Sequence, residues 1–283
     1  MTAKTNEQII QEPPFTEDEV AIQVTGLKKT FNGTDFVLNG LNLSIPKGKI
    51  TVLIGFSGTG KSVLMKHLMG LEKPTEGSIH ILGENLTIMT DELITLFRRR
   101  FGVLFQNAAL FDDMTAAENV MFPLMEHRPD LRRNQQKDVA VGKLKQVGIV
   151  EKDFDKLPNE LSGGMRKRVG LARAIALDPE IIFYDEPTTG LDPIMTEMVD
   201  NLILGTHKSR EGLTSIVISH DLSAAFRIGD YVAMLDKGQI LLFGTPKDFF
   251  ETDIELVHRF VTKGLHRETR HGGNNKNEPT EVS

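Results

Sequence analysis

The chain has 283 residues, of which 40% are hydrophobic and 25% are charged, and this is the composition of a globular protein rather than of a fibre or a disordered chain. It contains no cysteine, which excludes disulfide scaffolds, thiol catalysis and cysteine-ligated zinc or iron–sulfur sites. The net charge of −6 does not favour a nucleic-acid-binding surface, and no apolar run approaches the roughly 20 residues of a membrane-spanning helix. Because the start also lacks an apolar signal segment, we expect a soluble, cytosolic chain.

The order of apolar and polar stretches predicts one α/β domain at residues 20–264, between two polar ends. Residues 1–19 and residues 265–283 are too polar to fold alone, so we expect a flexible leader and a flexible tail. Six short runs, several of them apolar throughout, predict strands that are buried on both faces of a sheet. They are Ala21–Val24, Thr51–Ile54, Gly102–Phe105, Ile181–Tyr184, Ser215–Ser219 and Tyr231–Leu235.

A glycine-rich loop follows the second predicted strand. Residues 55–62 match the pattern G-x-x-x-x-G-K-[ST] and lead into a predicted helix at Ser62–Met69. Lys61 is expected to contact the β- and γ-phosphates of a nucleotide, and the Ser62 hydroxyl to bind Mg²⁺. An ordinary turn is the alternative, and the strand and helix on either side make it the weaker one. The predicted phosphate-binding residues are Gly55, Phe56, Ser57, Gly58, Thr59, Gly60, Lys61 and Ser62.

The residues after the third predicted strand differ from the rest of the domain in their pattern of apolar and charged residues. Gln106 directly follows that strand, where its amide would bind Mg²⁺ or an attacking water, although a glutamine at a strand end means nothing by itself. Residues 107–177 are mostly helical in pattern and charged, which predicts a helical subdomain inserted into the α/β core. Its breaks are expected at Pro123, Pro129 and Pro158.

Another glycine motif, of two adjacent glycines, precedes a basic amphipathic helix that is predicted at Arg166–Ala176. Ser162 is a good N-cap residue, and Gly163 and Gly164 expose backbone N–H groups at the positive end of the helix. This arrangement predicts a second phosphate site without a lysine of its own. Taken alone, the motif is better interpreted as an ordinary Ser-Gly-Gly helix start.

Ionisable side chains end two of the later strands. Asp185 and Glu186 follow Ile181–Tyr184, at the carboxyl edge where α/β sheets bind ligands. Asp185 would hold Mg²⁺, and Glu186 would orient and deprotonate the attacking water. His220, after another strand, would contact the γ-phosphate region. An isolated acidic pair is more often a solvated turn, and an isolated histidine a surface or capping residue; the phosphate loop favours the catalytic interpretation.

Together these motifs resemble the ATP-binding-cassette (ABC) ATPases, from about Val20 to Gly264. The resemblance implies an α/β P-loop NTPase fold with a mixed sheet core and a helical subdomain, and ATP hydrolysis with ATP and Mg²⁺. It places Phe31 where the family stacks an aromatic ring on adenine; otherwise Phe31 would be a core residue. The matching motifs are Walker A at 55–62, the Q-loop at Gln106, the signature at 161–165, Walker B at 181–186, the D-loop at 190–192 with Asp192, and the switch histidine at His220.

Two positions depart from the family pattern. Met165 ends the signature where glutamine is commoner, and Val63 stands where threonine often follows the Walker A serine. Neither change affects the lysine, the magnesium ligands or the base, so we expect an active ATPase.

The resemblance also implies partners. The chain has one copy of each motif, so the signature of one copy would close over ATP held by a second copy, which predicts a homodimer. A transport ATPase is the first interpretation, with a membrane permease seated in an apolar groove at Asn107–Phe111 and Met114; core packing of these side chains is an equal alternative. The second interpretation is a non-transport ABC ATPase, which is less favoured because the chain has a single cassette and no long heptad segment.

Within the transporters, four segments look like those of the Mla/MCE-associated lipid-transport ATPases. They are residues 58–67, 104–111, 119–127 and 161–168. This similarity implies phospholipid transport between inner and outer membranes, by an ATPase peripheral to the cytoplasmic side of the inner membrane. It further implies an MlaE-like permease, an MCE-domain protein and, in some systems, a STAS-domain protein. An importer ATPase for a polar solute is the alternative, and no nucleic-acid partner is expected.

Overall fold

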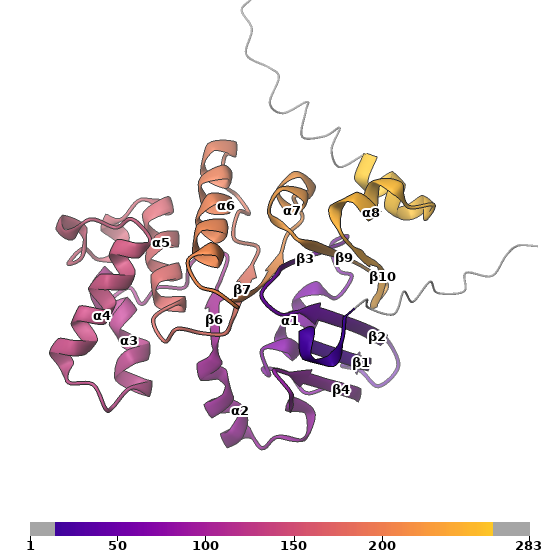
Figure 1. The fold of residues 1–283 in the computed structure, drawn as a ribbon, viewed down its shortest axis with the longest axis horizontal. Coiled ribbons are helices and arrows are strands. Elements are labelled where there is room, and N and C mark those ends of the chain that lie inside the picture. Colours follow the sequence, from indigo (N-terminus) through magenta and orange to yellow (C-terminus); the bar gives the residue numbers. More distant parts are fainter. Residues whose placement is uncertain (1–14, 263–283) are drawn as a thin grey trace, which may run out of the picture.

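The computed structural model describes residues 15–262, which form two β-sheets flanked by helices (Figure 1). The predicted tail and residues 1–14 of the predicted leader lie outside the described residues. The last part of that leader belongs to the folded domain. A 3-10 helix spans Glu17–Glu19, and the Phe15 ring packs edge-on against Tyr231 with 5.2 Å between ring centroids.

The central sheet has the strand order β10-β9-β3-β8-β7-β6, in which only β10 runs antiparallel to its neighbour. Its strands are β3 (Ile50–Ile54), β6 (Phe101–Leu104), β7 (Ile181–Asp185), β8 (Thr214–Ile218), β9 (Tyr231–Asp236) and β10 (Gln239–Gly244). Five of these strands match the predicted runs to within one residue at each end, which confirms those predictions. Every residue of β3 and β8 is buried, because helices and a second sheet cover the two faces.

The second sheet is antiparallel, with the order β2-β1-β4-β5. Its strands are β1 (Val20–Thr30), β2 (Phe36–Pro46), β4 (Glu76–Ile81) and β5 (Glu84–Asn85). The predicted strand at 21–24 lies inside β1, whereas β2, β4, β5 and β10 were not expected from the sequence. Buried residues of this sheet pack with Leu64, Met65 and Leu68 to form one of two hydrophobic cores.

The helices connect these strands. They are α1 (Lys61–Leu68), α2 (Asp91–Phe97), α3 (Ala116–His127), α4 (Arg133–Gln146), α5 (Gly163–Ala174), α6 (Pro193–Lys208), α7 (Leu222–Ile228) and α8 (Pro246–Glu251). Further 3-10 helices span Leu86–Ile88, Arg98–Arg100, Glu151–Asp153 and Pro158–Glu160, and residues 255–262 are also helical. Over residues 15–262, no helix has both the length and the apolar character needed to cross a membrane.

Helices α3, α4 and α5 lie together at one end of the molecule, on the left of Figure 1. The break predicted at Pro123 is wrong, because α3 continues through it to His127. Proline cannot donate to the carbonyl four residues earlier, but buried Val120, Met121 and Leu124 on the same helix pack into the second core and hold the helix in place. Pro129 does lie in the turn between α3 and α4, and Pro158 begins a 3-10 helix.

Candidate active site

The carboxyl ends of four adjacent parallel strands bring the predicted site residues to one edge of the central sheet. In the order β3-β8-β7-β6, these ends carry the phosphate loop, His220, the Asp185–Glu186 pair and Gln106. Ligands of α/β proteins bind at this edge. These residues are spread from residue 55 to residue 220 in the sequence, and it is the strand order of the sheet that places them next to one another.

The phosphate loop joins β3 to α1 through a backbone that needs glycine. Gly60 is the residue before α1 and has φ 104°, and Gly55 has φ 149°. A side chain on Gly55 would place its Cβ 2.3 Å from the Leu235 carbonyl oxygen of β9. The loop therefore passes too close to its neighbour for any other residue, and its amides stay available at the helix end.

Lys61 lies at the centre of this loop. Its ammonium donates hydrogen bonds to the carbonyl oxygens of Gly55 and Phe56, each at 2.9 Å, and the residue is only 8% exposed. Burial lowers the pKa of Lys61, while the negative charge of Glu186 acts in the opposite direction. The lysine and the predicted base are therefore close enough to interact electrostatically across β8.

The acidic pair ends β7, and its two carboxylates have different surroundings. Asp185 is half-buried, and burial together with neighbouring Glu186 raises its pKa. Glu186 has φ 46°, an uncommon backbone conformation for glutamate, and its amide donates to the Ile218 carbonyl oxygen of β8 at 3.2 Å. The strand pairing thus fixes the turn that points these side chains out of the sheet.

A small polar cluster surrounds the Glu186 carboxylate. Thr189 Oγ1 donates to Glu186 Oε2 at 3.0 Å, and His220 Nδ1 lies 3.8 Å from the same oxygen and 3.5 Å from Thr189 Oγ1. The structure therefore brings Glu186 and His220 together as the motifs imply. Thr189 is a contact that the sequence analysis missed; its only signal was a position three residues after Glu186.

Gln106, after β6, is exposed, and its carbonyl oxygen accepts a hydrogen bond from Lys167 Nζ of α5. This contact was not expected from the sequence. Ser62, at the start of α1, is also exposed. The Ser62 hydroxyl, the Asp185 carboxylate and the Gln106 amide all offer oxygen, which is the ligand type that Mg²⁺ takes.

The predicted second phosphate site is separate from the first within one chain. Ser162 caps α5, accepting a hydrogen bond from Met165 N at 3.3 Å, and Ser162 and Gly163 are exposed. The expectation that Gly164 is exposed is wrong, because Gly164 is buried and a side chain on it would place its Cβ 2.4 Å from Met195 Cε of α6. Figure 1 shows α5 in the helical group, away from α1. Asp192 is exposed and caps α6, where its Oδ1 accepts from Met195 N at 2.9 Å. These groups face outward and do not meet the phosphate loop of the same chain.

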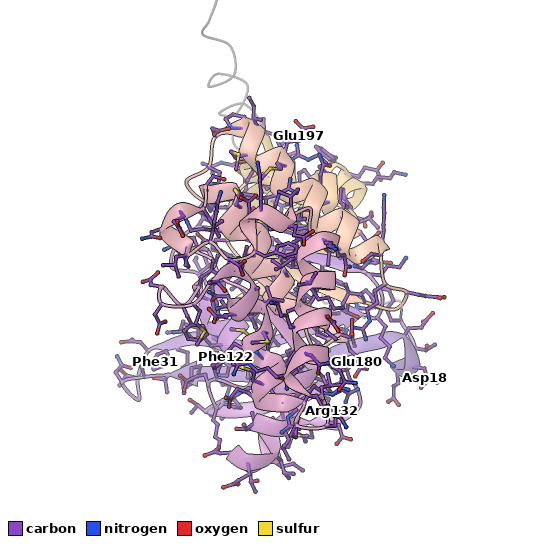
Figure 2. The ribbon with its side chains drawn as sticks, turned by 90° about the vertical axis from the view of Figure 1, so that its left-hand side faces the viewer. Asp18, Phe31, Phe122, Arg132, Glu180 and Glu197 are labelled. Atoms are coloured by element: carbon purple, nitrogen blue, oxygen red, sulfur yellow. The ribbon has the colours of Figure 1, made fainter. Side chains whose placement is uncertain are left out.

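Phe31 lies just beyond the end of β1 and is 64% exposed, so it is not a core residue. Figure 2 shows it projecting at one side of the molecule, opposite Asp18. The Lys29 ammonium lies over its ring at 5.0 Å. A second aromatic, Phe56 of the phosphate loop, packs edge-on against Phe260 of the helical residues 255–262, with 4.7 Å between centroids. This last contact was not expected from the sequence.

Comparison with known proteins places the chain in a family. The model of the ABC transporter family matches residues 38–189, more than half of the chain. Over 233 residues the chain is 39% identical to the intermembrane phospholipid transport system ATP-binding protein MlaF of Haemophilus influenzae, covering 82% of this chain and 87% of that one. It is also 40% identical over 242 residues to the probable ribonucleotide transport ATP-binding protein mkl of Mycobacterium leprae, covering 86% of this chain and 69% of that one.

Two solved structures support the same assignment. The ATP-binding cassette MJ0796, a dimer in a post-hydrolysis state with ADP and Pi, superposes with a TM-score of 0.72 at 32% identity, over 80% of this chain and 98% of that one. The protein cbiO1 of Clostridium perfringens, part of the cbiONQ transporter complex, gives a TM-score of 0.75 at 28% identity over 90% and 99% of the two chains. The predicted fold class and family are thereby confirmed. The chain belongs to the ABC transporter family, as an ATP-binding and ATP-hydrolysing subunit.

Proposed function

We propose that this subunit drives phospholipid transport between two membranes. The support is its 39% identity with MlaF, which extends over most of both chains. In such a system the ATPase would be peripheral to the cytoplasmic side of the inner membrane. It would work there with an MlaE-like permease and an MCE-domain protein, joined in some systems of this kind by a STAS-domain protein.

The observation that carries the chemistry is the position of the Glu186 carboxylate. It lies beside Thr189 and His220, across one strand from Lys61. Lys61 would bind the β- and γ-phosphates, and Glu186 would accept the proton of the water that attacks the γ-phosphate. Thr189 would hold the carboxylate toward that water, and His220 would contact the γ-phosphate.

Mg²⁺ fits the donor set at this edge. Burial of Asp185 raises its pKa in the metal-free protein, so a cation bound there would relieve an unfavourable buried charge. The ion would supply charge neutralisation for the phosphates. Ser62 at the start of α1, Asp185 at the end of β7 and Gln106 after β6 are the residues that would hold it, as oxygen donors.

The site requires a second copy of the chain. Ser162, Gly163 and Gly164 would contact the γ-phosphate of ATP bound to that copy, because the helix α5 at whose start they stand lies away from α1 and its phosphate loop in the same chain. Asp192 would lie at the same interface. The solved MJ0796 cassette, itself a dimer, supports this arrangement.

The permease would dock beyond Gln106. The segment was expected either to form a permease groove or to pack in the core, and different residues fit each expectation. Ala108 is buried and Leu110 packs against the core. Phe111 is 39% exposed, and its ring contacts the Phe122 ring with 4.7 Å between centroids. Phe111 is therefore the best candidate for the contact. We expect Phe111→Glu to abolish co-purification with the permease, because it would bury an unpaired carboxylate there, while ATP binding by the isolated chain persists.

A polar-solute importer is the second candidate, favoured by 37% identity over 230 residues with the methionine import ATP-binding protein MetN of Haemophilus influenzae. Cells that carry only the Lys61→Ala form distinguish the two. If the subunit drives lipid transport, we expect these cells to accumulate phospholipid in the outer leaflet of the outer membrane and to become sensitive to SDS with EDTA. An intact outer membrane with loss of amino-acid uptake would replace the lipid proposal with the importer.

A further inference from the structure

Two cations of α5 hold the backbone of the loop that carries Gln106. Lys167 Nζ donates to the Gln106 carbonyl oxygen, and the Arg173 guanidinium donates to the carbonyl oxygens of Ala108 at 2.7 Å and Ala109 at 2.8 Å. Lys167 is only 6% exposed. Burial lowers the pKa of both cations, so keeping them charged here has a cost that the carbonyl oxygens must offset.

The loop that they hold has an unfavourable backbone. Ala108 has φ 59° and Ala109 has φ 46°, so two consecutive alanines adopt the left-handed region that favours glycine. Such a conformation persists only where the surroundings impose it. Arg173 contacts the carbonyl oxygen of each of these two residues, which places the restraint at the point of strain.

The face of α5 toward the loop is built for close approach. Lys167, Gly170 and Arg173 are spaced three residues apart, which puts them on one side of the helix. A side chain on Gly170 would place its Cβ 2.9 Å from the Ala108 Cβ. The same helix begins at Ser162, the cap of the signature motif.

We propose that Lys167 and Arg173 are positioning residues for Gln106, fixing its loop so that the amide stands at the nucleotide edge of the sheet. The proposal rests on the function proposed above for Gln106. It also makes the Gln106 loop and the Ser162 end of α5 one rigid unit.

Hydrogen exchange of the full-length chain without nucleotide tests the restraint independently of catalysis. The Ala108 amide donates to the Phe105 carbonyl oxygen at 2.9 Å, so its exchange reports the loop. We expect amides of residues 105–112 to exchange about 10-fold faster in Lys167→Met and Arg173→Met, since each variant loses its side-chain hydrogen bonding to carbonyl oxygens of the loop. Unchanged exchange in both variants would overturn the proposal.

Arg168→Met is the matched control. Arg168 is another cation of α5 bonded to a carbonyl oxygen, that of Val147 at 2.8 Å, but it lies away from the loop. Its removal should leave exchange at 105–112 unchanged. Lys167→Gln keeps a donor and should restore protection, which also answers the case in which Lys167→Met fails to fold. The proposal would be overturned if Arg168→Met raised exchange at residues 105–112 as much as Lys167→Met does. It would also be overturned if Lys167→Gln exchanged as fast as Lys167→Met.

Kinetics test the link to Gln106. Lys167→Met should lower kcat and raise the Mg²⁺ concentration for half-maximal ATP hydrolysis, and both effects should largely vanish in a Gln106→Ala background, because residues that act as one unit are not additive. Equal losses in both backgrounds would overturn the proposal. If Gln106→Ala alone hydrolyses ATP at the wild-type rate, the proposed role of Gln106 fails, and hydrogen exchange still decides whether the two cations hold the loop.

Discussion

Glu186 and Lys61 should fail in different ways when they are replaced. Glu186→Gln keeps the shape and loses the base, so we expect ATP binding to persist while kcat falls by roughly 10²-fold or more. Lys61→Ala removes the buried ammonium of the phosphate loop, so ATP affinity itself should fall. Equilibrium binding of a fluorescent ATP analogue and steady-state hydrolysis measure the two effects separately. Wild-type turnover by Glu186→Gln would remove Glu186 from its role.

The ionised carboxylate of Asp185 should lower the free energy of unfolding, although the reaction needs that charge. Its raised pKa means that the folded chain holds the proton more strongly than the unfolded chain does. Ionisation therefore costs stability: the cost is absent below the unfolded pKa of about 3.9 and complete above the raised folded pKa. We expect Asp185→Asn to raise the Tm at pH 7 and to lose ATP hydrolysis.

The pH dependence of that Tm gain is the check. The gain should shrink as the pH is lowered toward about 4, because the wild-type carboxyl then becomes protonated and resembles the asparagine amide. Asp138→Asn on the exposed side of α4 provides a comparison that should show no such gain. A gain of the same size at pH 4 and pH 7 would contradict the electrostatic explanation.

Between elements, α6 and α7 are joined by an ion pair whose carboxylate is buried and whose guanidinium is partly exposed. Asp200 of α6 is 1% exposed, and Arg227 of α7 donates to its carboxylate. Burial raises the pKa of Asp200, and Arg227 acts against that rise. We expect Arg227→Ala to lower the unfolding free energy by about 2 kcal/mol, because it leaves a buried carboxylate unsatisfied. Chemical denaturation measures this value, and adding Asp200→Asn should recover part of the loss.

The elements that could be predicted from the sequence are those in which one signal dominates. Residues of β3, β7 and β8 are mostly apolar because helices and a second sheet bury both faces, and so the runs stand out. Strand β2 gives no such run, since Asn39, Gly40 and Asn42 interrupt its apolar residues and only every third of its first seven residues is buried. Its pairing with distant β1 decides its structure, and local sequence does not contain that information.

The site divides in the same way. Lys61, Glu186 and His220 are recognisable because chemistry requires those residue types after those strands. Thr189 and Lys167 were missed because a hydroxyl or a lysine has no distinctive pattern; their roles come from contacts across the fold. The break predicted at Pro123 fails for a related reason, since the packing of α3 outweighs a local preference.

At the level of the whole molecule, association of two copies should depend on the nucleotide, because the two proposed phosphate sites stand at the starts of α1 and α5, which lie apart in one chain. Glu186→Gln should elute as a dimer with Mg-ATP and as a monomer with ADP on a sizing column. Adding Ser162→Arg should abolish the dimer, since it places bulk and charge at the start of α5, while ATP binding to the loop persists. A chain that stays monomeric with ATP at every concentration would contradict the shared site.

The contact between Phe56 and Phe260 has a practical consequence for any version of this protein that is shortened or tagged. Residues 255–262 supply Phe260, whose ring packs edge-on against Phe56 of the phosphate loop. The backbone carbonyl oxygen of Phe56 accepts a hydrogen bond from Lys61. A chain cut before residue 255 would still contain every recognised motif, yet its nucleotide loop would have lost a neighbour. ATP constants measured on such a fragment would describe a differently supported loop, and comparisons between relatives should use chains that extend past this helical turn.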